Sequence, residues 1–362
     1  MPTQFWVQRD NIHKSKFVSL TDTPTLEDQQ ILMKVSQFAF TANNVTYAFT
    51  GERLGYWQFF PSGEDGWGII PVWGFGEVIE SKHADIAIGE RIYGYFPMAS
   101  HLIVTAGKVN PYGFTDAAAH RQSLSPIYNR YVRADKVEGY DASLEAINSL
   151  LRPMFTTSFL IDDFFADNDV FGASAIILSS ASSKTAYGTA FLLDANRNER
   201  PDYQVIGLTS KHNVPFVESL GCYDTVLAYG NSPELDASNT AAYIDFSGNL
   251  ATRTTVHEHY RDNLLYDCSV GSTHWEQTGS TKGIPGVRPE FFFAPAQAEK
   301  RLKEWGRDGY QQKSTTAWLA FINQAQHWMD ITPIAGQDTI QALYEAMVDG
   351  TTRPEKGYMM SL

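Results

Sequence analysis

Cysteine is scarce in this chain, since only Cys222 and Cys268 occur among 362 residues. Two cysteines cannot build a disulfide framework or a four-cysteine zinc site. Long apolar runs are also missing, because no stretch reaches the roughly 18 residues that a membrane span requires. The polar start from Met1 to Lys14 has no signal-peptide core. We therefore expect a soluble, cytoplasmic protein with reduced thiols, no zinc and no membrane contact.

Basic residues are the minority charge: 28 Lys and Arg stand against 41 Asp and Glu, for a net charge of −13. Nucleic-acid binders usually present a basic face, so the balance predicts no nucleic-acid partner. With 43% hydrophobic and 19% charged residues, the composition excludes disorder, collagen and coiled coil. The length is sufficient for two ordinary domains.

The first third of the chain is rich in short β signals. Residues 31–35, 76–80, 90–95 and 101–104 are expected strands, and glycine and proline separate them. Short strands with turn signals at this spacing are typical of a small barrel or sandwich.

From about residue 143 the pattern changes to alternating helix and strand. A helix is expected over 144–163, interrupted by Pro153. Alternation of this kind over about 120 residues predicts a parallel, doubly wound sheet. The expected strands are 175–179, 205–208, 225–228, 241–245 and 264–266, and the expected helices are 184–194, 213–220, 253–263, 294–305, 316–329 and 340–348.

The turn after the first of these strands carries the strongest chemical signal. In a doubly wound sheet, the first strand-to-helix turn offers backbone N–H groups and a helix N-terminus to a pyrophosphate. Small residues let the chain approach the phosphates, hydroxyls can donate to them, and a lysine adds positive charge. The alternative is an ordinary helix that serine caps. The candidate cofactor residues here are Ser180, Ala181, Ser182, Ser183, Lys184 and Thr185.

The end of the next strand predicts which nucleotide is bound. An acidic residue here would favour NAD by accepting from the adenosine ribose. The chain instead has Ser210 and Lys211, which suit a 2′-phosphate and hence NADP. The alternative is a solvated surface lysine.

A third candidate lies after the strand 241–245. Asp245 and Ser247 stand at the carboxyl edge of the sheet, where ligands bind in open α/β folds. An Asx turn built on the same residues explains the pattern equally well.

Two other features of the sequence favour structural rather than functional explanations. Solvent-facing side chains are expected for His257 and His259, and a loop packed on the core is expected for the aromatic segment 56–60 with Trp67 and Trp73.

Several motifs together resemble the medium-chain dehydrogenase/reductase superfamily, in its zinc-free quinone oxidoreductase-like branch, and within it an offshoot defined as a domain of unknown function. Residues 71–78 are similar to its Pro-Gly-x-Gly-Glu-Val segment, 89–94 to its Gly-Asp-Arg-Val turn, and 219–224 to its Leu-Gly-Ala-Asp helix end. The family's nucleotide pattern Gly-x-x-Gly-x-x-Gly falls on Ser180, Ser183 and Ala186. Serine thus replaces glycine at two places where a left-handed backbone is expected.

The resemblance implies a GroES-like β-barrel domain over 1–142 and 286–362 and a Rossmann domain over 143–285. It implies NADPH-dependent reduction of an activated carbonyl, enone or quinone, in which Asn43 and Tyr47 bind the developing oxyanion. The implied partners are a small-molecule substrate and a second copy of the chain in a homodimer. A non-catalytic descendant, or a lyase or isomerase on the same fold, remains the alternative.

Overall fold

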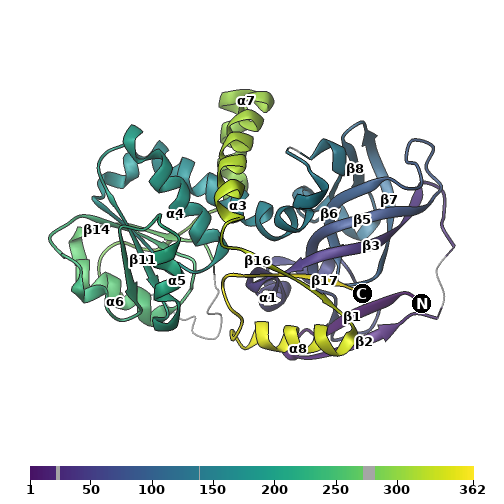
Figure 1. The fold of residues 1–362 in the computed structure, drawn as a ribbon, viewed down its shortest axis with the longest axis horizontal. Coiled ribbons are helices and arrows are strands. Elements are labelled where there is room, and N and C mark those ends of the chain that lie inside the picture. The colour runs from purple at the N-terminus through teal and green to yellow at the C-terminus, as the bar shows by residue number, and fades with distance from the viewer. Residues whose placement is uncertain (22–24, 138, 272–281) are drawn as a thin grey trace. The chain divides into compact units, whose positions relative to one another are not determined.

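The computed structural model describes residues 1–21, 25–137, 139–271 and 282–362. The chain divides into two compact units. The barrel unit contains Met1–Leu150 and Met329–Leu362, and the sheet unit contains Leu151–Trp328. Figure 1 shows the first mainly in purple, blue and yellow and the second in teal and green.

The barrel unit is built on six strands that close on themselves, because β3 pairs with both β5 and β7. Two paired glycines, on β5 and β6, allow close approaches of neighbouring parts of the barrel. Gly74 and Gly94 are register partners, and a Cβ on Gly94 would lie 2.5 Å from the Tyr131 ring. In hydrogen-bonded order the strands are β3 (Gln30–Phe40), β5 (Pro71–Ser81), β6 (Arg91–Pro97), β9 (Arg130–Arg133), β8 (Gly113–Asp116) and β7 (His101–Asn110).

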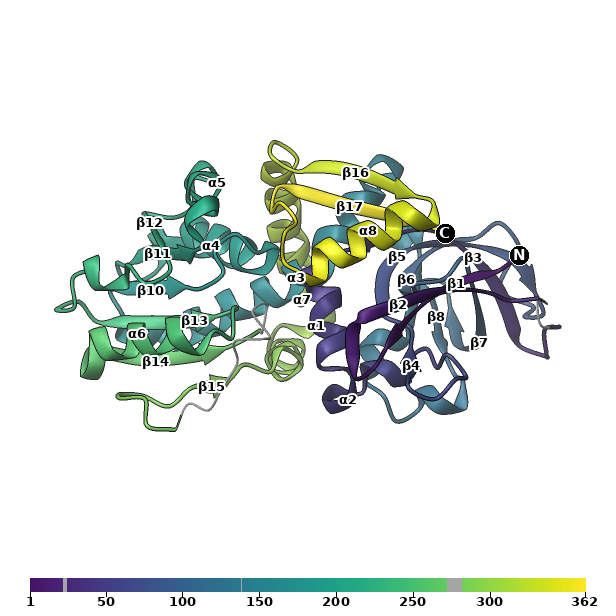
Figure 2. The same cartoon turned by 90° about the horizontal axis from the view of Figure 1, so that it is seen from below.

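Further elements of the same unit extend and cover the barrel. β17 (Lys356–Ser361) adds to β3, and β16 (Asp330–Ala335) adds to β17, so the C-terminal segment completes the sheet (Figure 2). A separate small sheet has the order β2–β1–β4. The remaining strands and α-helices of this unit are β1 (Thr3–Gln8), β2 (Asn11–Ser19), β4 (Trp67–Gly68), α1 (Ala42–Phe49), α2 (Gly51–Leu54) and α8 (Gln337–Val348).

The sheet unit contains a six-stranded parallel sheet in the order β12–β11–β10–β13–β14–β15. In chain order this is 3-2-1-4-5-6, the doubly wound dinucleotide-binding arrangement, with its switch point between β10 and β13. Helix α6 buries Val256 and Tyr260 against strand residues of this sheet. The strands are β10 (Ala175–Leu178), β11 (Gln204–Thr209), β12 (Thr225–Ala228), β13 (Ala241–Asp245), β14 (Leu264–Ser269) and β15 (Glu290–Phe291).

The helices of the sheet unit pack closely on one another as well as on the sheet. A Cβ on Gly188 would lie 2.7 Å from Ser158 Oγ, so α3 and α4 approach at a position that only glycine allows. The α-helices are α3 (Glu145–Asp167, which begins in the barrel unit), α4 (Lys184–Asn196), α5 (Val214–Ser219), α6 (Leu250–Tyr260) and α7 (Ala294–Ala325).

Short 3₁₀ helices form many of the connections in both units. They are η1 (Tyr56–Gln58), η2 (Ala119–Arg121), η3 (Pro126–Asn129), η4 (Ala134–Lys136), η5 (Ala142–Leu144), η6 (Asp169–Gly172), η7 (Arg197–Glu199), η8 (Lys211–Asn213), η9 (Ser232–Glu234) and η10 (Arg261–Asn263).

The structure combines the predicted β-barrel with the predicted doubly wound sheet, which confirms the fold class. Besides shifts of a few residues at helix ends, the continuity of helices differs from the prediction in two places. Helix α3 continues through Pro153, and α7 is one long helix that bends at Gly306, where φ is 69°. Residues 286–328, which the sequence analysis grouped with the barrel domain, lie in the sheet unit. The reason is aromatic packing, since Phe321 of α7 stacks on Phe155 of α3 with ring centroids 4.6 Å apart.

Candidate functional site

The turn after β10 contains a residue in the left-handed conformation. Ser180 takes φ = 50°, a left-handed conformation that glycine usually supplies. Two protein contacts hold it there. The Ser180 N–H donates to Tyr229 Oη at 3.0 Å, and the next N–H, of Ala181, donates to Leu208 O at 3.0 Å. The loop therefore reaches this shape without glycine, at a cost in backbone strain.

Serines then lead the loop into α4. Ser183 caps the helix, because its Oγ accepts from the Ala186 N–H at 3.3 Å. The Ser182 hydroxyl lies 3.3 Å from Thr209 Oγ1 and accepts from Asn213 Nδ2 at 3.1 Å. Lys184 and Thr185 form the first turn of the helix, whose N-terminal N–H groups and dipole favour an anion.

The second predicted segment lies beside this loop, because Thr209 and Asn213 both contact Ser182. Ser210 is the N-cap residue of η8, and Lys211 begins that helix with an exposed side chain. The Lys211 side chain has no ion pair or hydrogen bond within the part of the chain that the structure describes. The described structure thus brings the two predicted cofactor segments together at one edge of the sheet.

The third predicted segment forms an Asx turn. Asp245 Oδ1 accepts from Ser179 Oγ at 2.6 Å, from Ser247 Oγ at 2.7 Å and from the Gly248 N–H at 3.1 Å. Its Oδ2 pairs with Arg253 Nη2 at 2.9 Å. Oδ1 is therefore occupied by protein donors, Oδ2 faces the Arg253 guanidinium, and the carboxylate joins the ends of β10 and β13 at the switch point of the sheet.

A buried ionic network extends from this turn, and it corrects one expectation. His257 is fully buried rather than solvent-facing. Its Nε2 lies 2.7 Å from Asp267 Oδ2 and its Nδ1 lies 2.7 Å from Pro285 O, so the ring can donate to both only when both nitrogens carry protons. Arg253 Nε lies 3.1 Å from the same Asp267 oxygen. The network sets the carboxylates of Asp245 and Asp267 against the Arg253 guanidinium, with the His257 ring as a further partner of Asp267, which lowers the cost of burying charge here.

In the barrel unit, helix α1 carries both predicted catalytic residues. Asn43 and Tyr47 are four residues apart and share one face of the helix. The neighbouring Asn44 has a structural role, since its Oδ1 accepts from the Thr41 N–H at 2.8 Å and its Nδ2 donates to Pro71 O at 2.9 Å. Of the two adjacent asparagines, only Asn43 therefore has its amide next to the Tyr47 hydroxyl.

Tyr47 belongs to a cluster of aromatic side chains that we call the phenol cluster, formed by Tyr47, Tyr56, Tyr95, Tyr128 and Trp73. The ring centroids of Tyr47 and Tyr56 are 4.4 Å apart, and those of Tyr95 and Tyr128 are 4.7 Å apart. The polar groups around the Tyr47 hydroxyl come from Trp73, Asn43 and Tyr128. Burial, reinforced by the neighbouring phenols, raises the pKa of Tyr47, Tyr95 and Tyr128. These hydroxyls therefore stay protonated and are able to donate hydrogen bonds.

Two donors of the phenol cluster are unsatisfied. Tyr95 Oη and Trp73 Nε1 are buried, and neither has a hydrogen-bond partner among the described residues. An unsatisfied buried donor costs about 1–3 kcal/mol, so such groups call for an explanation. A substrate oxygen is an acceptor that would satisfy them.

Sequence reasoning missed most of this cluster. Tyr95 lies on β6 and Tyr128 on η3, far from Tyr47 along the chain. The aromatic segment 56–60 and Trp73 were noted, but a packed loop was the preferred explanation. One sequence pattern could have pointed to the cluster. Tyr93 and Tyr95 are two residues apart in a strand, so both tyrosines lie on one face of the sheet.

Neither a metal-ion cluster nor a membrane-spanning helix occurs within residues 1–21, 25–137, 139–271 and 282–362. No group of three or more His, Cys, Asp or Glu in these ranges could hold a metal ion. No helix within them is both long and apolar enough to cross a membrane.

Solved structures with the same fold extend over the whole chain. CurA from Vibrio vulnificus in complex with NADPH is 13% identical, has a TM-score of 0.62, and the match covers 99% of this chain and 98% of that chain. A mutant form of enoyl thioester reductase from Candida tropicalis is 10% identical, with a TM-score of 0.56 and coverage of 100% and 99%. The yhdH oxidoreductase from Salmonella enterica in complex with NADP is 12% identical, with a TM-score of 0.51 and coverage of 100% for both chains.

These likenesses show that the chain shares the fold of these reductases, a barrel unit with a doubly wound sheet unit, as the sequence predicted. A comparison with curated protein sequences finds no match. One protein family matches residues 38–353. Because that match spans most of the sequence, the chain belongs to the family described as "Protein of unknown function (DUF2855)".

Proposed function

We propose that this protein is an NADPH-dependent oxidoreductase that reduces an activated carbonyl, enone or quinone without zinc. The observation that carries the proposal is the left-handed backbone of Ser180 at the end of β10. It supports dinucleotide binding by a loop that has lost its glycines. The NADP(H) complexes of CurA and the yhdH oxidoreductase, which share the fold, add support from outside the chain.

The residues at the sheet edge fit the cofactor. In the proposal, the loop residues 180–185 hold the pyrophosphate at the start of α4, and Ser210 and Lys211 hold the 2′-phosphate. Asp245 and Ser247 shape the neighbouring turn, since Asp245 Oδ1 is already occupied by protein donors and Oδ2 faces the Arg253 guanidinium. When bound, NADPH supplies a hydride.

The phenol cluster performs the other half of the chemistry. Reduction of a carbonyl or enone places negative charge on the substrate oxygen, and preorganised donors stabilise that charge. Tyr47 and Asn43 donate to this oxygen, and Tyr47 is the proton donor. Because burial raises its pKa, the hydroxyl keeps its proton throughout the physiological range. The substrate is a small molecule, and we place the protein in the cytoplasm as a homodimer.

Turnover with a panel of quinones and enones, followed by the loss of reduced-nicotinamide absorbance, tests this proposal. Tyr47→Phe should lower the turnover number by about 100-fold, the usual effect of removing one oxyanion donor. The affinity for NADPH should not change. Tyr112→Phe is the matched control, because Tyr112 is 53% exposed. Unchanged turnover in Tyr47→Phe would remove Tyr47 from the mechanism, and absence of NADPH-dependent turnover with every compound would favour the non-catalytic alternative.

A further inference from the structure

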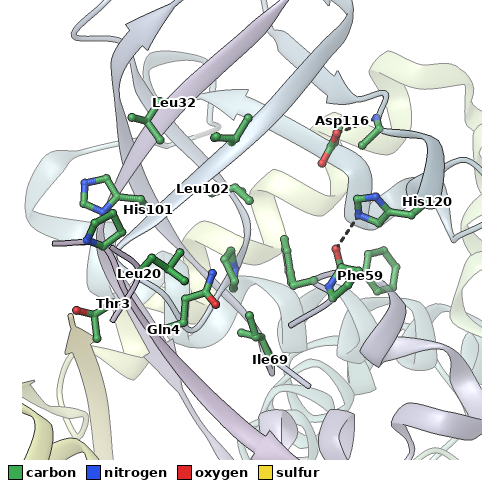
Figure 3. A pocket seen from close by; sticks show the side chains of 16 residues that line it. Thr3, Gln4, Leu20, Leu32, Phe59, Ile69, His101, Leu102, Asp116 and His120 are labelled. Carbon is green, nitrogen blue, oxygen red and sulfur yellow. Dashed lines mark hydrogen bonds between the residues drawn. The ribbon is translucent and has the colours of Figure 1, made fainter. Parts of the chain in front are cut away.

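The barrel unit contains a pocket of about 260 Å³ that the proposed reaction does not use. Its walls come from the start of β1, the start of β7, the end of β8 and the segment after η1. Figure 3 shows Asp116 and His120 on one side and His101 and Thr3 on the other, with Leu32 and Leu102 between them. The volume equals that of about nine liquid water molecules, enough for a small organic molecule.

The pocket is mainly apolar but has one carboxylate in its wall. The Asp116 side chain is only 4% exposed. Its Oδ1 accepts from the Ala118 N–H at 3.0 Å, whereas the nearest cation, Arg121 Nε, lies 3.7 Å from Oδ2. No side chain among the described residues donates a hydrogen bond to this carboxylate. The carboxylate is thus ion-paired with Arg121 and hydrogen-bonded to the backbone, and because a carboxylate offers about four acceptor sites, it can accept a further hydrogen bond from a ligand.

Arg121 does not donate such a hydrogen bond because its N–H groups are used elsewhere. Nε donates to Asn129 Oδ1 at 2.8 Å, Nη1 to Phe59 O at 2.8 Å and Nη2 to Tyr128 O at 3.2 Å. The guanidinium also lies against the rings of Phe59 and Phe60. It therefore offsets the charge of Asp116 at a distance and leaves a carboxylate oxygen available.

Two histidines also line the pocket. The Nε2 of His120 lies 3.3 Å from Phe59 O. Burial, with help from Lys34 and the N-terminus, lowers the pKa of His101, so that ring adds no positive charge near neutral pH. Burial also raises the pKa of Asp116, and the Arg121 charge offsets only part of this effect.

We propose that this pocket binds a small amine with an apolar body, whose ammonium group hydrogen-bonds to Asp116 and whose hydrocarbon part lies along Leu102 and Leu32. A protonated amine can donate a charge-assisted hydrogen bond to this carboxylate. An aromatic or aliphatic body fills the apolar walls. The lining residues of the pocket belong to the barrel unit, whereas the predicted nucleotide residues belong to the sheet unit, so the inference goes beyond the proposed reductase activity.

Calorimetric titration with three probes of similar size and shape tests the ligand class. The probes are 2-phenylethylamine, 2-phenylethanol and phenylacetate, which carry positive, zero and negative charge. The proposal expects the amine to bind at least about tenfold more tightly than the alcohol, and the acid to bind least. Equal binding of amine and alcohol, or binding of none of the three, would overturn it.

Variants of the pocket test the location. Asp116→Asn should reduce the preference for the amine to within about twofold, since the shape is kept and the charge is lost. Leu102→Trp should abolish binding by filling the pocket. Because this variant leaves the Asp116–Arg121 pair intact, it still tests the location if Asp116→Asn fails to fold. Asp135→Asn is the control, because that carboxylate is 66% exposed. Amine binding that survives Leu102→Trp, or that NADPH displaces, would place the amine elsewhere and refute the proposal.

Discussion

At the scale of single residues, the most informative position is Ser180. A serine occupies a left-handed position where its own N–H donates to the Tyr229 hydroxyl and the next residue, Ala181, is held by the Leu208 carbonyl and packs on a glycine of β11. A Cβ on that glycine, Gly207, would lie 3.0 Å from the Ala181 side chain. The loop is therefore specified by its neighbours rather than by its own glycines.

Substitutions at Ser180 test this explanation. Ser180→Gly should keep or strengthen nucleotide binding, because glycine adopts φ = 50° without strain. Ser180→Val should lower the free energy of unfolding by about 1–3 kcal/mol and weaken NADPH and NADH alike, since a β-branched residue is strongly disfavoured there. Denaturant unfolding and nucleotide titration of both variants give the answer. Parent-like binding by the valine variant would show that the left-handed turn is not required.

At the scale of elements, the ion network behind β13 and β14 holds the sheet edge together. Arg253 faces both Asp245 and Asp267, and its side chain is 11% exposed. Arg253→Met should lower the free energy of unfolding by about 3–5 kcal/mol, because two buried carboxylates lose their shared cation. Lys303→Met is the control, since Lys303 forms an exposed pair with Glu299 on α7. Urea unfolding of both variants distinguishes them, and equal stabilities would contradict the role given to Arg253.

The start of α3 gives a prediction about pH. Burial alone would raise the pKa of Glu145, but hydrogen bonds from Arg91, Tyr140 and Gln37 bring it below the ordinary value of 4.5. A carboxylate with a lowered pKa stabilises the folded state above the unfolded-state pKa, and this contribution is lost as pH falls through the folded-state pKa.

The free energy of unfolding, measured from pH 7 down to pH 3, tests whether the contribution of Glu145 is lost as the pH falls. Glu145→Gln should be less stable than the parent at pH 7, and the difference should shrink below about pH 4.5. Glu80→Gln, which changes an exposed carboxylate of β5, should follow the parent curve. A stability difference that does not vary with pH would show that the ionised pair is not responsible.

Elements were predictable from the sequence where local pattern decides them. Strands β12 and β13 coincide with the predicted ranges 225–228 and 241–245, because continuous apolar runs bounded by turn residues are local signals. The polar stretch 306–315 looked like a break between helices but continues as α7 with a bend at Gly306. The burial of His257 could not be predicted, because its partners Asp267 and Pro285 lie 10 and 28 residues further along the chain.

At the scale of the whole molecule, the two units carry different parts of the proposed chemistry. The sheet unit brings Ser182, Thr209 and Asn213 together at one edge, as the alternation of strands and helices implied. The barrel unit assembles the phenol cluster from α1, η1, β5, β6 and η3, which lie far apart along the chain. The meeting of the two predicted loop segments could thus be foreseen from the sequence, whereas most of the phenol cluster could not.

The central claim is that the serine-built loop binds NADPH, and calorimetric titration of the parent, Lys184→Ala and Lys211→Ala with NADPH and NADH tests it most directly. Charge-assisted hydrogen bonds of this kind contribute about 1.5–3 kcal/mol. The parent should bind NADPH more tightly than NADH, and Lys184→Ala should weaken both because both carry the pyrophosphate. Lys211→Ala should weaken NADPH by about 10-fold to 100-fold and leave NADH nearly unchanged, because only NADPH carries the 2′-phosphate. Binding of neither nucleotide by the parent, or NADPH binding that is unchanged in Lys211→Ala, would contradict the account.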